Sequence, residues 1–282
     1  MAHLVQVGAG SGGMVVLDLV ARDPRITRVT LIEPDVYKPH NAERHYFGPQ
    51  AAGRLKADLA VEWLRQFRPE LPVRTLVCDV TDPAAQPAIE AAVRDATLGV
   101  CAVDREPAKF HWDQLMRTCA RPWTLGEVLS GGIGGFVHIF TPGGPCYGCV
   151  ASFLQRSVAV EQPAVPDYSQ PGGGIEETTV PASKASIHAI ASWHAVVTLR
   201  LLEQVLAEPS SAPGSPGGDL DFTSLLVTLQ RVPDVFDEAL RPHRFRVPRM
   251  ADCLICRPGP APSSSENLDV ALDQALARLG NA

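Results

Sequence analysis

The chain has 282 residues, of which 45% are hydrophobic and 20% are charged, and its net charge is −6. These values lie close to those of ordinary globular proteins and exclude a disordered chain or a coiled coil. A mildly acidic protein is also a poor candidate for binding nucleic acid or an anionic membrane, because both need a basic surface. The length allows one large domain or two small ones.

The first half of the chain alternates between short apolar runs and segments with helical spacing. Alternation of this kind favours a parallel sheet with helices on both faces. The predicted elements, in chain order, are a strand at 3–7, a helix over 14–19, a strand at 28–32, a helix at 55–67, a strand at 73–77, a helix at 84–96 and a strand at 98–103.

After residue 123 the pattern changes. Two strands are predicted at 124–129 and 136–140, on either side of the glycine-rich run 131–135, and they indicate an antiparallel extension of the sheet. Residues 151–183 have weak periodicity and predict a long loop, which inside a compact domain is usually functional or disordered.

The rest of the chain predicts one buried helix, one Pro/Gly/Ser linker and two short strands, at 187–206, 207–219, 225–229 and 245–247 respectively. One compact domain should therefore span residues 1–258. Residues 259–282 should form a second linker and an amphipathic helix, since four leucines fall on one helical face: Leu268, Leu272, Leu276 and Leu279.

Two observations concern the compartment. The N-terminus lacks the basic region that precedes the apolar core of a signal peptide. The most apolar stretch, 187–206, is interrupted by His188, His194 and Arg200, whereas a membrane span needs about 20 nearly uninterrupted apolar residues. We therefore expect a cytoplasmic protein without a membrane span, in which paired cysteines more often bind metal than form disulfides.

A glycine-rich loop follows the first predicted strand. Residues 8–13 read Gly-Ala-Gly-Ser-Gly-Gly, and Gly8, Gly10 and Gly13 fill the three positions of a G-x-G-x-x-G motif. Such glycines let backbone N–H groups approach a phosphate, and the following helix adds its partial positive charge. Glu33, at the end of the second strand, can hold a ribose hydroxyl. The motif predicts a nucleotide site, and taken alone it suggests NAD.

The polar segment after the second strand is not explained by a dehydrogenase. Its pattern is Glu33-x-Asp35, then Asn41-x-x-Arg44, then Gly53-x-x-Lys56-Ala57. Together with the glycine loop, this order resembles the adenylating superfamily of ubiquitin-activating enzymes and their bacterial relatives MoeB and ThiF. Asp104, after the fourth strand, matches the metal-binding aspartate of that family. The resemblance implies a Rossmann-like, doubly wound, mostly parallel α/β fold.

The resemblance also implies an activity, namely adenylation of a carboxylate by ATP and Mg²⁺ with release of pyrophosphate. Such a site needs cations on the phosphates and a carboxylate for the metal, with little covalent help. Arg44 and Lys56 would contact the triphosphate, and Asp104 would position Mg²⁺. Glu33, which departs from the aspartate usual in the family, would bind the ribose. Asn41 and Asp35 would lie on the adenosine or phosphate side.

Two C-x-x-C pairs lie far apart in the sequence, Cys146 with Cys149 and Cys253 with Cys256. Four thiolates in two such pairs predict a closed tetrahedral zinc site, which is structural because it leaves no open coordination position. Relatives in the superfamily carry the same two pairs at similar places. Separate redox-active or buried cysteines are the alternative interpretation.

The remaining cysteines are Cys78, Cys101 and Cys119, of which the first two are predicted core thiols at strand ends. Relatives that form a thioester usually carry the nucleophile in the crossover loop or in an inserted domain. The crossover loop here should be 151–183, and it contains no cysteine. We therefore expect the activated acyl group to pass to a thiol on a partner protein, with Cys119 as the alternative acceptor.

The predicted function is thus ATP-dependent adenylation of the C-terminal glycine of a ubiquitin-like or sulfur-carrier protein, by a divergent and homodimeric bacterial-type member of the superfamily. A ubiquitin-like pathway is slightly favoured. One alternative is an NAD-dependent dehydrogenase, which gives no role to Asn41, Arg44 or Lys56. Another is a non-catalytic partner subunit, against which the intact Arg44, Lys56 and Asp104 argue.

Overall fold

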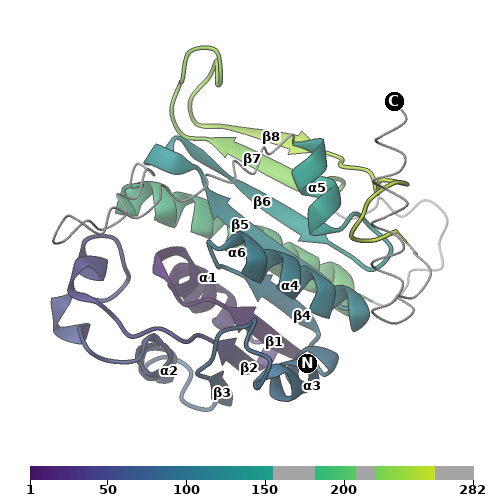
Figure 1. Cartoon of the computed structure of the whole chain (residues 1–282). Coiled ribbons are helices and arrows are strands. Elements are labelled where there is room, and N and C mark those ends of the chain that lie inside the picture. The colour runs from purple at the N-terminus through teal and green to yellow at the C-terminus, as the bar shows by residue number, and fades with distance from the viewer. Residues whose placement is uncertain (155–181, 208–219, 258–282) are drawn as a thin grey trace, which may run out of the picture.

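The computed structural model describes residues 1–154, 182–207 and 220–257. The strands are Ala2–Val7 (β1), Ile26–Ile32 (β2), Val73–Leu76 (β3), Leu98–Cys101 (β4), Trp123–Val128 (β5), Gly134–Phe140 (β6), Ser224–Thr228 (β7) and Arg241–Phe245 (β8). Within these ranges they form one sheet in the order β3-β2-β1-β4-β5-β6-β7-β8 (Figure 1). β1 to β5 pair in parallel, whereas β6, β7 and β8 continue the sheet in antiparallel register.

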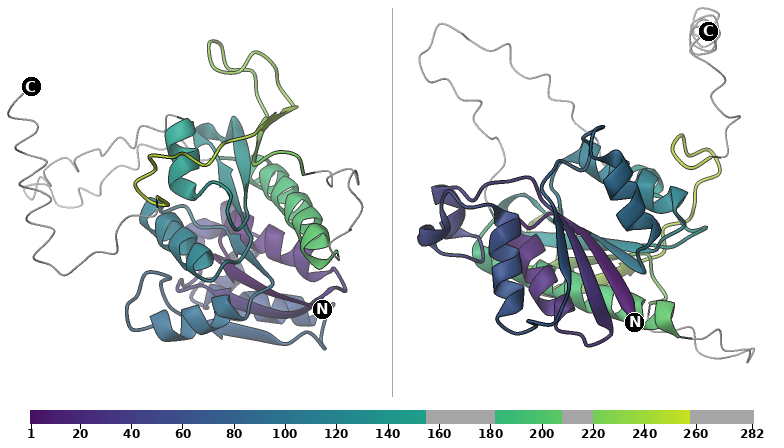
Figure 2. Two further views of the ribbon diagram at one scale, coloured as in Figure 1. Left: turned by 90° about the vertical axis from the view of Figure 1, so that its right-hand side faces the viewer. Right: turned by 90° about the horizontal axis from the view of Figure 1, so that it is seen from below.

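The helices cover both faces of the sheet. They are α1 (Ser11–Ala21), α2 (Lys56–Arg65), α3 (Gln86–Arg94), α4 (Glu106–Thr118), α5 (Tyr147–Phe153) and α6 (Lys184–Leu206), with 3₁₀ turns η1 (Pro39–Glu43), η2 (Pro49–Ala51) and η3 (Ser130–Gly132). Side chains of α1, α2 and α6 share one apolar core with the sheet, and those of α3, α4 and α5 share another. Figure 2 shows α6 and α4 on opposite sides of the sheet.

The burial of each strand matches its composition. β1 and β4 are buried along their whole length, as expected for parallel strands covered by helices on both faces. β8 is mostly exposed at the edge of the sheet and reads Arg-Pro-His-Arg-Phe. Pro242 lacks an N–H group, and charged side chains and proline are typical of an edge strand that does not pair further.

The predicted fold is confirmed: a mostly parallel Rossmann-like sheet with an antiparallel extension. Several predicted bounds are wrong by a few residues. β4 ends at Cys101, two residues early, and β8 lies at 241–245 rather than 245–247. The loop predicted from residue 151 begins later, because α5 continues to Phe153. The linkers at 208–219 and 258–265, most of the crossover loop and the C-terminal helix lie outside the described residues.

Helix α6 is long and apolar enough to cross a membrane by length and composition, with a mean hydropathy of 1.2. In this fold it packs against α1, β5 and β6 as a core helix. Its His194 is buried, and Nε2 lies 2.9 Å from the hydroxyl oxygen of Thr124. Burial lowers the pKa of His194 to about 3, so that the ring is neutral and packs in the core.

Candidate functional site

The glycine loop joins β1 to α1, and two of its glycines are required by close backbone contacts. Gly8 has φ +92°, and a Cβ atom there would lie 2.5 Å from the carbonyl oxygen of Ala102. A Cβ at Gly13 would lie 2.5 Å from the carbonyl oxygen of Gly8. A Cβ at Gly10 would meet no atom within 4 Å, so this glycine borders open space. Gly8 and Gly13 therefore shape the loop, and Gly10 leaves room for a ligand.

Glu33 connects the glycine loop to the end of β2. Its side chain is 4% exposed, and its two carboxylate oxygens accept hydrogen bonds from the N–H groups of Ala9 and Asp35. Burial raises the pKa of the Glu33 carboxyl, although both hydrogen bonds and the charge of Lys56 oppose the rise. The carboxylate keeps further lone pairs with which it can accept a ribose hydroxyl.

Lys56 and Asp35 lie together where the segment after β2 meets α2. Lys56 Nζ lies 2.7 Å from an Asp35 carboxylate oxygen, and the backbone N–H of Lys56 donates to the carbonyl of Asp35. Lys56 is 8% exposed, whereas the Asp35 side chain is 59% exposed. The ion pair holds the lysine near the glycine-loop end of the sheet before any ligand binds.

Asn41 and Arg44 belong to the η1 turn and the residue that caps it. The side-chain oxygen of Asn41 accepts the N–H of Lys38 at 2.8 Å, so it stabilises the turn. The carbonyl of Asn41 accepts the N–H groups of Arg44 and His45. The guanidinium of Arg44 is partly exposed and makes no ion pair or hydrogen bond with the described residues. It is therefore available to an anionic ligand.

Asp104 follows β4 in an exposed loop beside the glycine loop. The two loops are joined where the N–H of Ala102 donates to the carbonyl of Val7, and where Gly8 packs on Ala102. Within the ranges that the structure covers, no hydrogen bond or ion pair engages the Asp104 carboxylate. An exposed carboxylate without a partner suits Mg²⁺, which prefers oxygen ligands and retains several waters.

The predicted nucleotide residues thus come from loops at one edge of the sheet. They follow the carboxyl ends of β1, β2 and β4, or lie in the segment that leads from β2 to α2 (Figure 1). The strand order reverses at β1, which is flanked by β2 and β4. Open α/β sheets bind ligands in the crevice outside the carboxyl ends of the strands at such a switch point.

Two side chains that the sequence analysis did not single out, Gln6 and His45, hold the glycine loop. Gln6 Nε2 donates to the carbonyls of Gly8 and Gly13, and His45 Nε2 lies 3.0 Å from the carbonyl oxygen of Ala9. The sequence contains a feature that could have identified each of these two residues. Gln6 is a polar residue between Val5 and Val7 in the first strand, and His45 directly follows the Asn41-x-x-Arg44 motif.

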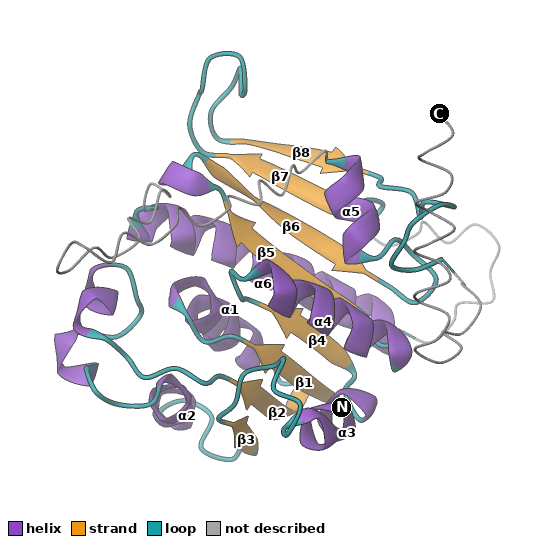
Figure 3. Ribbon diagram, viewed as in Figure 1, coloured by secondary structure: helices purple, strands orange, loops and turns teal. Residues whose placement is uncertain are grey.

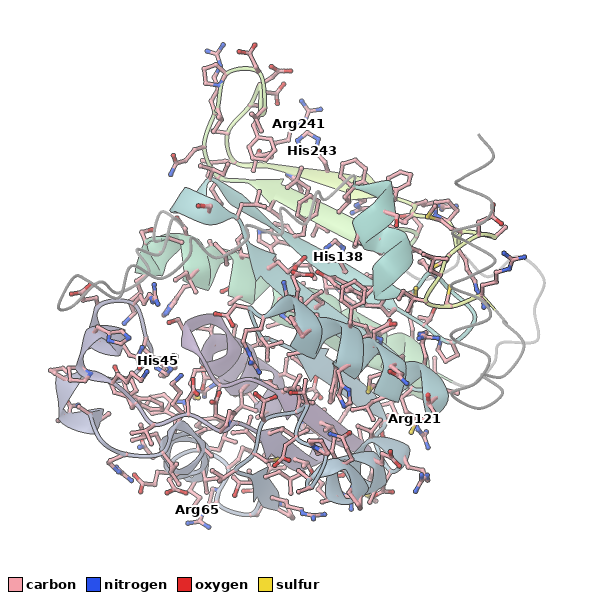
Figure 4. All side chains as sticks on the ribbon, in the orientation of Figure 1. His45, Arg65, Arg121, His138, Arg241 and His243 are labelled. Atoms are coloured by element: carbon pink, nitrogen blue, oxygen red, sulfur yellow. The ribbon has the colours of Figure 1, made fainter. Side chains whose placement is uncertain are left out.

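A second polar cluster lies at the start of α4 and was not predicted. Lys109 Nζ lies 2.6 Å from a Glu106 oxygen and 2.7 Å from a Glu127 oxygen. Burial opposes the charge of Lys109, but the two carboxylates outweigh it and raise the pKa of the ammonium group. The other Glu127 oxygen lies 3.1 Å from His138 Nε2, and His138 Nδ1 lies 2.8 Å from the hydroxyl oxygen of Ser224 (Figure 4).

This Ser–His–Glu arrangement is structural rather than hydrolytic. Ser224 and His138 are both 0% exposed, so a substrate carbonyl cannot reach the hydroxyl. Together with Lys109 on α4, the cluster joins residues of β5, β6 and β7.

The four paired cysteines meet as the sequence predicted. Their sulfur atoms all lie within 4.8 Å of one another, and three of the distances are 3.7 Å (Cys146 to Cys149), 3.5 Å (Cys146 to Cys253) and 3.6 Å (Cys149 to Cys256). A tetrahedron with Zn–S bonds of about 2.3 Å has sulfur–sulfur edges of about 3.8 Å. The N–H of Met250 points to the sulfur of Cys149 at 3.4 Å. The geometry and the four thiols fit a structural zinc ion.

The other three cysteines lie apart from this centre. Cys101 is buried at the end of β4, and burial raises the pKa of its thiol to about 12. Cys78 is half-buried. Cys119 caps the C-terminal end of α4, whereas Asp104 precedes its N-terminal end. A helix of this length spans about 20 Å, so Cys119 is remote from the proposed phosphate site.

Comparisons with known proteins agree with this architecture. The model of the ThiF family matches residues 1–220. Ubiquitin-like modifier-activating enzyme 5 of Arabidopsis thaliana is 22% identical over 164 residues, which are 54% of this chain and 38% of that protein. This chain therefore spans less than half the length of that curated relative.

Solved structures of E. coli MccB share the fold. The complex with MccA-N7isoASN superimposes with a TM-score of 0.64 at 16% identity, over 91% of this chain and 67% of that one. The complex with ATP gives 0.61 at 16% identity, over 90% and 66% respectively. The family match extends over most of the chain and agrees with the resemblance that the sequence motifs indicated. The chain belongs to the ThiF family.

Proposed function

We propose that this protein uses ATP and Mg²⁺ to adenylate the C-terminal carboxylate of a protein or peptide, with release of pyrophosphate. The observation that carries the proposal is that one cation and one carboxylate near the glycine loop are both without a partner among the described residues. Arg44 and Asp104 both lack a partner among the described residues, and they lie on two loops at the carboxyl edge of the sheet. A dehydrogenase would leave both without a role.

The roles of the individual side chains follow from their surroundings. The N-terminus of α1 and the cations of Arg44 and Lys56 would stabilise charge on the triphosphate, and Glu33 would accept a ribose hydroxyl. Asn41 and Asp35 would support the adenosine or phosphate side. Mg²⁺ bound at Asp104 would neutralise the leaving pyrophosphate.

In the chemical step, an oxygen of the substrate carboxylate forms a bond to the α-phosphorus, and the bond from that phosphorus to the bridging oxygen of pyrophosphate breaks. No proton has to be transferred, so the step needs no general base. Positioning and charge stabilisation are then the main requirements, and the candidate residues provide both. Lys56 can exchange Asp35 for a phosphate oxygen without leaving its position.

The substrate that we propose is a ubiquitin-like or sulfur-carrier protein with a C-terminal glycine. The name of the Arabidopsis relative and the family membership support this class. Cys119 lies at the far end of α4, which supports transfer of the activated acyl group to a thiol on a partner protein. We further propose a cytoplasmic homodimer in which each chain holds one structural zinc ion.

ATP–pyrophosphate exchange tests the proposal. Exchange should depend on a carrier with a C-terminal glycine, and Asp104→Ala should remove it while circular dichroism and the melting temperature remain unchanged. Asp237→Ala, which changes an exposed aspartate in the loop between β7 and β8, is the matched control and should leave exchange intact. Tight binding of NAD, with no exchange for any carrier or peptide, would refute the adenylation function.

A further inference from the structure

Three carbonyl oxygens of the glycine loop are held from the protein side by two buried side chains. Gln6 Nε2 donates to the carbonyl oxygens of Gly8 and Gly13, each at 2.8 Å. His45 Nε2 lies 3.0 Å from the carbonyl oxygen of Ala9. Gln6 is 0% exposed and His45 is 1% exposed. These contacts therefore belong to the interior beneath the loop, on the side away from solvent.

The protonation of His45 follows from its partner. Burial lowers the pKa of His45 to about 4, so the ring is neutral near pH 7 and carries a single N–H. A carbonyl oxygen can only accept, so that N–H is on Nε2. The ring packs edge-on against Tyr37 and stacks on Phe47, which fixes its orientation.

The amide of Gln6 is oriented by the same reasoning. Both of its partners are carbonyl oxygens, so the nitrogen must be the atom that faces them. Its two N–H groups then serve two carbonyls, one at each end of the loop. The backbone N–H of Ala9 is also engaged, because it donates a hydrogen bond to the Glu33 carboxylate.

The hydrogen bonds of Gln6 and His45 determine which backbone groups of the glycine loop can face a phosphate. A carbonyl oxygen turned toward a triphosphate repels it, whereas an N–H group binds it. In this loop the carbonyls of Gly8 and Ala9 are engaged on the inner side, and the carbonyl of Gly13, the third residue of α1, points along the helix away from its N-terminus. The N–H groups of the first turn of α1 have no acceptor within the helix and point outward from its N-terminus.

We propose that Gln6 and His45 are positioning residues for the nucleotide phosphates: they hold the glycine-loop carbonyls inward, so that the loop presents N–H groups alone. The inference rests on the proposed nucleotide-binding function. His45 also follows Arg44 directly, so the same hydrogen bond anchors the segment that carries the Arg44 guanidinium. Figure 4 shows His45 between that segment and α1.

The test is a series of ligands that differ only in phosphate number: adenosine, AMP, ADP and ATP, measured by calorimetry in the presence of Mg²⁺. His45→Phe keeps an aromatic ring but removes the donor. It should weaken ATP binding about tenfold, ADP and AMP progressively less, and adenosine not at all. His45→Gln restores a donor and should recover most of the ATP affinity.

Two further variants complete the series. Gln6→Met should give the same phosphate-dependent loss if it folds, and the His45 pair tests the inference if it does not. His111→Phe is the matched control, because this histidine contacts Gln86, which begins α3, rather than the glycine loop. It should leave all four affinities unchanged.

The results that would overturn the inference are specific. Unchanged ATP affinity in His45→Phe would overturn it, and so would an equal loss for adenosine and ATP, which indicates general damage to the fold. In both cases the wild-type chain still binds ATP and the proposed function stands. A wild-type chain that binds none of the four ligands would overturn the proposed function and this inference together.

Discussion

The parallel and antiparallel halves of the sheet are built differently. β1 and β4 of the parallel half are fully buried. The residues proposed to bind ATP follow the carboxyl ends of β1, β2 and β4, or lie in the segment that leads from β2 to α2 (Figure 3). The antiparallel half ends in β8, an exposed edge strand rich in arginine. The chain after β8 returns to α5, where Cys253 and Cys256 meet Cys146 and Cys149.

This difference indicates that the parallel half carries the proposed chemistry, whereas the antiparallel half depends on the metal centre for stability. In the parallel half, apolar burial stabilises the strands, and the loops and the start of α2 carry Arg44, Asp104 and Lys56. In the antiparallel half, β7 is buried but the edge strand β8 is exposed, and a metal centre would hold the C-terminal segment that follows β8. Variants of one half should therefore change activity, and variants of the other should change stability.

The largest effect is expected from the metal centre. Cys253→Ser with Cys256→Ser should abolish zinc binding, measured as about one ion per chain in the wild type. The free energy of unfolding should fall by more than about 3 kcal/mol, since zinc contributes about 10–16 kcal/mol to folding of zinc-finger peptides. Hydrogen exchange should accelerate in β8 and in residues 246–257.

ATP affinity of the same double variant, measured at low temperature where it stays folded, should remain within about twofold of the wild type. Cys119→Ser is the matched control and should keep both the metal and the stability. A large loss of ATP affinity in the zinc variant would show that the two halves are not separable.

Lys109 lies where the halves meet, and its loss should come next in size. Lys109→Met removes the ammonium group that lies 2.7 Å from the Glu127 carboxylate, and removing one partner of a buried pair costs about 3–5 kcal/mol. Adding Glu127→Gln to this variant should recover part of the loss. Urea denaturation measures both. Lys184→Met, at the exposed start of α6, should change stability by less than about 0.5 kcal/mol.

The sequence predicted the parallel half well because its signals are local. An apolar run, a glycine loop and a helical repeat each occupy a few consecutive residues, and Gly8, Glu33 and Asp104 fall at the ends of such runs. The two C-x-x-C pairs lie far apart in the sequence, but the spacing within each pair was enough to predict a zinc site. The ends of elements were less predictable: α5 continues past the first cysteine pair, because Cys146 acts as its N-cap and the apolar residues of α5 pack in the core.

The contacts of the site could not be read from spacing, because they depend on tertiary structure. Nothing in the sequence shows that Asp35 pairs with Lys56, or that the Asn41 side chain closes its own turn. Gln6 is separated by 39 positions from His45, yet both hold the same loop. Lys109, Glu127, His138 and Ser224 likewise come from four elements and meet only when the sheet forms.

Replacing Arg44 should change the rate of the reaction without changing the stability of the fold. Arg44→Ala should lower the rate of ATP–pyrophosphate exchange about 100-fold, as expected for the loss of one group that stabilises charge in a transition state. Its melting temperature should stay within about 1 °C of the wild type, because the guanidinium makes no contact that stabilises the described fold. Arg65→Ala, an exposed arginine on α2, is the control and should keep full exchange. Loss of stability in Arg44→Ala would contradict the separation of the two roles.

The most gradual effect is a pH dependence shared by both regions. His45 beneath the glycine loop and His194 under β5 have folded-state pKa values of about 4 and about 3, against 6.5 when unfolded. Below pH 6.5 the unfolded chain binds protons that the folded chain does not, so stability falls as the pH falls. Each histidine contributes at most about 1.4 kcal/mol per pH unit, down to about pH 4 for His45 and about pH 3 for His194.

Two buried carboxyls act in the opposite direction. Burial raises the pKa of Glu33 and Asp113, so each binds its proton more tightly in the folded chain and offsets part of the loss at low pH. Comparison with a variant isolates one histidine from this background. Urea denaturation of His194→Gln between pH 4.5 and 7.5 should give a shallower slope than the wild type, and His45→Gln should do the same independently. Equal slopes in all three chains would mean that neither histidine is held neutral by burial.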